Sequence, residues 1–283
     1  MEMKRFSTIL KNEEITSLAI GGFDGLHVAH QKLISHLGLK GILLIIDKKT
    51  ASLTPNKYRC RHLEHRCVFL DFDEIKQMSA SSFVSFLKEW FVNLEKIVVG
   101  YDFRFGKDAL GDAKELKRLF SKEVVIVDEV FVDGISVHSR VIRTLLKEGK
   151  LKTVSSLLGR HYEIVGKVIK GQGVGAKKLF ATLNLEVKDF LIPKEGVYAT
   201  FTKIGKKSYP SVTFIGKRLS TDGKFSIETH LLDEKLQQIK GDITICFIVF
   251  LRDNKKFNSL DELKEQISKD LDKSRSYLKF TQL

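Results

Sequence analysis

The sequence predicts an α/β fold with a doubly wound parallel sheet, followed by a β-barrel and a C-terminal helix. Strand-like apolar runs alternate with helix-like runs as far as about residue 155, which is typical of a parallel sheet with helices on both faces. After Gly159, short β-rich runs follow one another between Gly, Lys and Asp turns, which favours an antiparallel sheet or barrel. We therefore expect two domains, 1–157 and 158–283.

Each element of the first domain follows from its own pattern. Aliphatic runs indicate buried parallel strands, and they occupy 41–47, 67–73 and 96–103. A short apolar run broken by Gly at 15–23 and a strand region at 123–134 complete the set. Amphipathic spacing indicates helices, and it occurs over 27–39, 79–94, 112–122 and, as one or two helices, 139–159. Ser79 is a plausible N-cap for the second of these helices.

The second domain is predicted as an antiparallel sheet or barrel. Its expected strands lie in the runs 162–171, 181–187, 196–205, 207–216, 225–233 and 241–251. The run 259–278 has helical apolar spacing, and Ser259 is placed to cap that helix.

Composition limits the classes of protein. The net charge of +13 among 283 residues favours anionic partners such as phosphate-bearing metabolites or nucleic acid, although solvated lysines would give the same number. Cys60, Cys67 and Cys246 form no close CxxC pair, which argues for a reducing cytosol and against a disulfide framework or zinc site. No run has the roughly 18–20 apolar residues of a membrane span, so we expect a cytoplasmic protein that binds no membrane.

The stretch AIGGFDGLHVAHQKLI, residues 19–34, joins the first strand to the first helix. Free N–H groups and the positive end of a helix dipole meet at such a junction, so it is typical of a phosphate site. Gly21 and Gly22 allow an anion or a base to approach the main chain. His27 and His30 lie three positions apart and can face one point, where they would donate hydrogen bonds to phosphoryl oxygens. A tight turn with incidental histidines is the alternative.

This stretch resembles the G-x-F-D-G-x-H-x-G-H-Q signature of prokaryotic bifunctional riboflavin kinase/FAD synthetases, with Ala29 in place of the last Gly. The segment 98–112 resembles the G-x-D-F-x-F-G motif of that family, and 139–149 its S-S-T-x-I-R motif, with His138 and Arg140 replacing a Ser and the Thr. The T-F-x-P-H-P motif is not visible in residues 45–55.

The resemblance implies a Rossmann-like nucleotidylyltransferase domain that adenylylates FMN. The residues it assigns to ATP are Gly22, Phe23, Asp24, Gly25, His27, His30, Ser139, Arg140 and Arg143, with both histidines catalytic. Those it assigns to the flavin are Asp102, Phe103, Arg104 and Phe105. Two core phenylalanines with solvated charges are the alternative for the second set.

Residues 171–187 resemble the flavokinase segment G-R-x-x-G-F-P-T-A-N-L, although Ala181 replaces its Pro. This resemblance implies ATP binding by Gly175, Thr182 and Asn184, and Mg²⁺ binding by the oxygens of Thr182 and Asn184. Glu228 aligns with the carboxylate that acts as base on the ribityl hydroxyl.

The expected protein is a two-step enzyme, a monomer or weak homo-oligomer, that converts riboflavin to FMN and FMN to FAD with ATP and Mg²⁺. One alternative is an FMN adenylyltransferase whose barrel only binds flavin. Another is a basic nucleic-acid-binding protein, which the charge favours but the ordered motifs do not.

Overall fold

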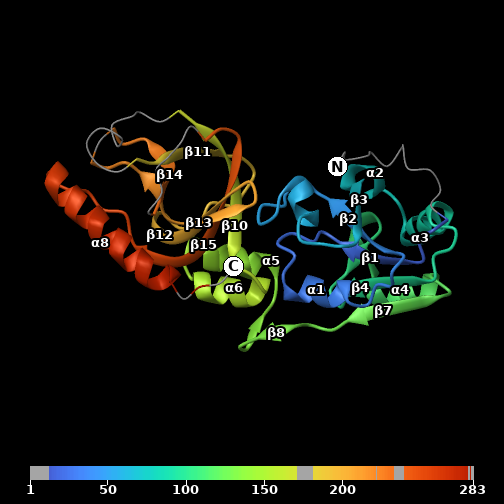
Figure 1. Cartoon of the computed structure of the whole chain (residues 1–283). Coiled ribbons are helices and arrows are strands. Elements are labelled where there is room, and N and C mark those ends of the chain that lie inside the picture. The colour runs from blue at the N-terminus through green and yellow to red at the C-terminus, as the bar shows by residue number, and fades with distance from the viewer. Residues whose placement is uncertain (1–12, 171–180, 221, 233–238, 280, 282–283) are drawn as a thin grey trace. The chain divides into compact units, whose positions relative to one another are not determined.

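The computed structural model describes residues 13–170, 181–220, 222–232, 239–279 and 281. The chain forms two compact units, 1–139 and 140–283 (Figure 1). The division of the activities near residue 157 stays a prediction. Among the described residues, no helix is both long and apolar enough to cross a membrane.

The first unit is built on a parallel five-stranded sheet. Its strands are β1 (Ser17–Gly21), β2 (Gly41–Asp47), β3 (Arg66–Asp71), β4 (Lys96–Gly100) and β7 (Glu123–Val127). Their order is β3-β2-β1-β4-β7, so the chain winds to one side of β1 and then to the other. In such sheets ligands bind beyond the carboxyl ends of the strands at the point of reversal, which here lies beyond β1 and β4.

Helices cover both faces of this sheet, which confirms the doubly wound prediction. Leu33 and Ile34 of α1 (Val28–Ile34) pack on one face. The other face packs against α2 (Phe72–Ile75), α3 (Ala80–Trp90) and α4 (Ala113–Leu119). The central strands β1, β2 and β4 are largely buried on both sides, which explains their aliphatic runs.

Short elements surround the carboxyl ends of the strands. Two hairpins occur, β5 (Arg104–Phe105) with β6 (Gly111–Asp112) and β8 (Phe131–Val132) with β9 (Ile135–Ser136). Two 3₁₀ helices, η2 (Asn56–Cys60) and η3 (Lys107–Ala109), lie in the connections. The predicted strand region 123–134 therefore contains two strands. β7 belongs to the parallel sheet, and β8 is the first strand of a separate hairpin.

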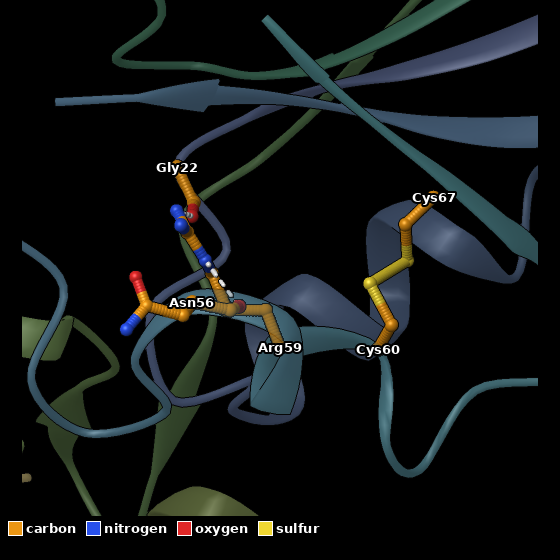
Figure 2. Close-up of a disulfide and its surroundings, with 5 residues drawn as sticks. All are labelled: Gly22, Asn56, Arg59, Cys60 and Cys67. Carbon is orange, nitrogen blue, oxygen red and sulfur yellow. Dashed lines mark hydrogen bonds between the residues drawn. A yellow bond between two sulfur atoms is a disulfide. The ribbon is translucent and has the colours of Figure 1, made fainter. Parts of the chain in front are cut away.

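Cys60 and Cys67 form a disulfide, with their Cα atoms 6.3 Å apart (Figure 2). The expectation that the cysteines would argue against a disulfide was wrong. An odd total leaves one cysteine unpaired but says nothing about the other two. The turn between η2 and β3 brings these two together, a geometry that sequence spacing does not reveal.

The second unit holds a closed antiparallel barrel, as predicted. Its strands are β10 (Tyr162–Ile169), β11 (Leu183–Val187), β12 (Gly196–Ile204), β13 (Lys207–Lys217), β14 (Phe225–Leu231) and β15 (Asp242–Arg252), in the order β10-β11-β14-β13-β12-β15. Helices that accompany it in the described part of the chain are α5 (Ser139–Lys147), α6 (Leu151–Leu158) and α8 (Leu260–Leu278). The side chain of Ser259 caps α8 by accepting a hydrogen bond from the Glu262 N–H, which confirms the predicted start of that helix.

A cluster of hydroxyls lies among buried residues of the barrel. Thr200, Thr202, Ser211, Thr213 and Thr229 have exposures of 0%. Their side chains join in one hydrogen-bonded network with oxygen–oxygen distances of 2.8 to 3.2 Å. Buried hydroxyls are costly unless they are paired, and here each one bonds to another.

Candidate functional site

The loop after β1 has an unusual backbone. Phe23 has φ +51°, Gly25 +89° and Leu26 +42°. Positive φ is unfavourable for side chains with a Cβ, and the surrounding structure must hold Phe23 and Leu26 there. Both side chains are fully buried beneath the sheet end. Gly22 is exposed, and a Cβ at that position would meet nothing within 4 Å, so a ligand has room beside it.

Asp24 binds a neighbouring loop. Its carboxylate accepts hydrogen bonds from the N–H groups of Ser52 at 3.2 Å and of Leu53 and Thr54 at 2.9 Å. The Gly25 N–H donates to the Thr54 hydroxyl at 2.7 Å. Asp24 is buried, and its carboxylate would repel a phosphate. Its side chain therefore holds the loop, and a contact of Asp24 with ATP stays a prediction.

The two histidines lie together, as their spacing predicts. The rings of His27 and His30 stack with centroids 3.6 Å apart at an angle of 14°. His27 is the N-cap of α1, and its Nδ1 accepts a hydrogen bond from the His30 N–H at 3.4 Å. That acceptor role puts the proton of a neutral His27 ring on Nε2. Nε2 is then the hydrogen-bond donor of this ring, and His27 is buried at 4% exposure.

Arg59 is a residue that sequence reasoning missed. It is 1% exposed, and its guanidinium donates to the Asp47 carboxylate at 2.8 Å. The guanidinium also donates to the Gly22 carbonyl at 3.3 Å (Figure 2). In the sequence it is one of many basic residues in a polar connection, where the motif expected after the second strand is not visible. Only the fold reveals its contact with the loop.

The remaining residues assigned to ATP lie on or beside α5. The Ser139 hydroxyl donates to the Asp24 carbonyl at 2.7 Å, so it too holds the loop. Arg140 is exposed and Arg143 is half-buried, and both belong to the second unit. Their contact with the triphosphate stays a prediction.

The segment assigned to the flavin has an exposed part and a buried part. Asp102 and Arg104 are exposed and Phe103 is half-buried. Phe105 is buried in the core, where its ring stacks under that of Phe103 with centroids 5.5 Å apart. The ring of Phe105 therefore supports Phe103 and does not itself face a ligand, so the alternative of a core phenylalanine holds at this position.

A polar cluster adjoins this segment. His138 lies within 4.0 Å of Asp102, 3.6 Å of Glu129 and 3.3 Å of the Tyr101 hydroxyl. A hydrogen bond from Ser136 lowers the pKa of Glu129. The cluster follows β4 and β7, at the sheet edge where ligands are expected.

In the barrel, the candidate kinase residues lie on two adjacent strands. Asn184 of β11 pairs with Glu228 of β14, and the Thr182 hydroxyl lies 3.4 Å from the Glu228 carboxylate. Arg218, which the sequence did not single out, donates to Glu228 at 3.3 Å and to Asp222 at 2.8 and 2.9 Å. Gly175 lies outside the described residues.

The side-chain oxygens of Thr182 and Asn184 are suitable ligands for Mg²⁺. The Thr182 hydroxyl and the Asn184 amide carbonyl are oxygen donors, which magnesium prefers, and it usually completes its shell with phosphates and water. The described residues hold no group of three or more His, Cys, Asp or Glu side chains placed for a metal ion.

Comparison with known proteins gives two family matches. Residues 42–141 match the FAD synthetase family and residues 158–278 match the riboflavin kinase family. Proteins described as bifunctional riboflavin kinase/FMN adenylyltransferase are similar over nearly the whole length. The protein from Buchnera aphidicola subsp. Acyrthosiphon pisum is 31% identical, covering 95% of this chain and 96% of the relative. The protein from Escherichia coli K12 is 29% identical, covering 93% of each.

A solved structure shares the fold. The crystal structure named as a macrolide-efflux protein from Streptococcus pneumoniae superposes with a TM-score of 0.84 at 24% identity. The superposition covers 96% of this chain and 97% of the other. At this identity the likeness concerns the fold alone.

Proposed function

The chain belongs to the bifunctional riboflavin kinase/FMN adenylyltransferase family, and from this premise we propose how its residues divide the two reactions. The enzyme phosphorylates riboflavin with ATP to give FMN, and it adenylylates FMN with a second ATP to give FAD and pyrophosphate. Because both a riboflavin kinase and an FAD synthetase match are present, the alternative of an adenylyltransferase with a degenerate barrel is not favoured.

In the kinase reaction, Glu228 accepts the proton of the ribityl hydroxyl as that oxygen attacks the γ-phosphorus of ATP. Arg218 and Thr182 orient the carboxylate through their contacts of 3.3 and 3.4 Å. Thr182 and Asn184 would hold Mg²⁺, which when bound neutralises charge on the ATP phosphates. The observation that carries this assignment is the direct pairing of Asn184 with Glu228 across β11 and β14.

In the adenylyl transfer, a phosphate oxygen of FMN attacks the α-phosphorus of ATP and pyrophosphate leaves. No covalent enzyme intermediate is required, so the site supplies proximity and charge stabilisation. The Nε2–H of His27 and the ring of His30 donate toward the phosphates, and the exposed Gly22 lets them approach. Asp24 and Ser139 hold the loop. Asp102, Phe103 and Arg104 contact FMN.

We further propose that the enzyme is a cytoplasmic monomer or weak homo-oligomer that needs Mg²⁺ and binds neither nucleic acid nor membrane. Its substrates are small molecules, and the basic surface suits their phosphates. Disulfides are rare in cytoplasmic proteins. The oxidation state of Cys60 and Cys67 in cells is therefore a direct test of the location.

Chromatography of the products tests the division of labour. With riboflavin, ATP and Mg²⁺, the protein should form FMN and then FAD, and with FMN supplied directly it should form FAD. FAD from FMN without any FMN from riboflavin would contradict the kinase assignment.

A further inference from the structure

We propose that Arg59 is a positioning residue for adenylyl transfer, because it fixes the Gly22–Phe23 peptide with its N–H group toward the nucleotide. This inference rests on the proposed role of the loop after β1 in binding ATP. Arg59 lies in η2, 37 residues after Gly22, and no family motif singled it out.

The burial of Arg59 shows that its position is strongly determined. A guanidinium that is 1% exposed loses its hydration. This loss costs free energy unless the N–H groups form hydrogen bonds within the protein. One terminal nitrogen bonds Asp47 at 2.8 Å, the other bonds the Gly22 carbonyl, and Nε bonds the Asn56 carbonyl at 3.3 Å. The ring of Phe69 lies 5.0 Å from the guanidinium carbon.

The contact with Gly22 sets the direction of a hydrogen-bond donor. In a trans peptide the C=O and the following N–H point in opposite directions. Because the Gly22 carbonyl points at Arg59, the Phe23 N–H points away from it. Among the residues that the structure describes, none accepts a hydrogen bond from this N–H. The Arg59 contact therefore fixes the orientation of this donor next to the exposed Gly22.

The backbone conformation of Phe23 explains why the Gly22–Phe23 peptide needs the contact with Arg59. Its φ of +51° is an unfavourable conformation for a residue with a Cβ. A peptide in this conformation relaxes if nothing restrains it. Donors that are fixed in advance stabilise developing charge most effectively, and a displacement of about 1 Å can cost about 10²-fold in rate.

The segment that carries Arg59 is itself anchored. η2 ends at Cys60, whose disulfide joins it to Cys67 in β3 (Figure 2). Before η2, Ser52, Leu53 and Thr54 bind the carboxylate of Asp24. The same connection therefore holds the glycine loop at Gly22 and at Asp24.

The test compares Arg59→Met and Arg59→Lys with the wild type, with FMN supplied directly. We expect Arg59→Met to lower kcat for FAD formation about 10²-fold, and Arg59→Lys to recover part of that loss because an ammonium can still donate to one acceptor. The KM for FMN should change little. Riboflavin phosphorylation by the same preparations should stay within about twofold of wild type, since the barrel is untouched.

Asp47→Asn is the matched control for lost packing and charge. It removes the ion pair but keeps the Gly22 contact, so we expect FAD formation within about threefold of wild type. The proposal is overturned if Asp47→Asn lowers kcat as much as Arg59→Met. It is also overturned if folded Arg59→Met keeps wild-type kcat. Should Arg59→Met not fold, Arg59→Lys decides: wild-type kcat overturns the proposal, and a loss of about fivefold or more at unchanged KM for FMN supports it.

His27→Ala separates this inference from the proposed site. If His27→Ala lowers FAD formation and the Arg59 variants do not, only the role of Arg59 fails. If neither position affects FAD formation in folded protein, the loop is not the ATP site and both proposals fail.

Discussion

The two candidate sites are held in different ways. The adenylyltransferase loop depends on hydrogen bonds with two other segments, the connection that carries Thr54 and Arg59 and the start of α5 at Ser139. In the barrel, Asn184 and Glu228 lie opposite each other because the register of two strands puts them there. A site on a loop needs distant residues to fix its backbone, whereas a site on strands receives its geometry from the sheet.

This difference predicts where each activity is vulnerable. Substitutions far from the reacting atoms should harm FAD formation through the loop. The kinase site should respond mainly to changes in the side chains that contact substrate. Because one chain carries both activities, each serves as an internal control for the other.

The largest expected effect is at Glu228. Glu228→Gln keeps the shape of the side chain but removes the proton acceptor, so we expect riboflavin phosphorylation to fall about 10³-fold. FAD formation from added FMN should stay at the wild-type rate. Both are measured by chromatography of the products, and equal losses in the two assays would contradict the division between the units.

The next effect concerns the stacked histidines. His27→Ala or His30→Ala removes a donor near the phosphates, and we expect FAD formation to fall about 10²-fold while FMN formation is spared. The loss should appear in kcat with FMN and ATP saturating. Unchanged kcat in both variants would show that the rings only pack against each other.

A smaller effect is expected from Asp24→Asn, which tests whether the loop depends on remote support. The neutral amide accepts fewer and weaker hydrogen bonds from residues 52–54, so the free energy of unfolding should fall by about 2.5 kcal/mol. Thermal or denaturant unfolding measures this. Asp73→Asn on the exposed helix α2 is the control, and a similar change there would contradict the argument.

The disulfide should have a smaller effect still. The double substitution Cys60→Ser and Cys67→Ser should lower the free energy of unfolding of the first unit by about 2 kcal/mol. FAD formation by this double variant should fall by less than the about 10³-fold loss of FMN formation that is expected for Glu228→Gln. Unfolding with and without a reducing agent provides the measurement, and wild type under reducing conditions should behave like the double variant.

The smallest response is expected from Cys246. Burial raises the pKa of its thiol to about 12, so at pH 8 it stays protonated and should not react with an alkylating agent in the folded protein. The unfolded chain loses this proton near pH 9, so the free energy of unfolding falls as the pH rises from 9 toward 12. Mass spectrometry after reduction should show label on Cys60 and Cys67 before Cys246.

The sequence was sufficient for those features that repeat along the chain. The buried runs of the parallel sheet, the alternating strands of the barrel and the Ser259 cap each have a local pattern, and the structure confirms them. The spacing of His27 and His30 predicts that they face one point, and the structure brings the two rings together.

The sequence was insufficient where one residue acts on another far along the chain. Arg59 reaches Gly22 across 37 residues, and Asp24 reaches Thr54 across 30. The polar connections that carry these residues have no hydrophobic periodicity from which such contacts could be predicted. Phe105 shows the reverse error, because a motif that names an aromatic does not say whether its ring faces a ligand or the core.

The hydroxyl network of the barrel has a consequence for its protons. Thr200, Ser211 and Thr213 each bond to other hydroxyls at full burial, so every member can give its hydrogen to one neighbour and receive one from another. We expect these hydrogens to exchange with deuterated water only when strands separate. Their exchange times would then measure how often the barrel opens, independently of either catalytic activity.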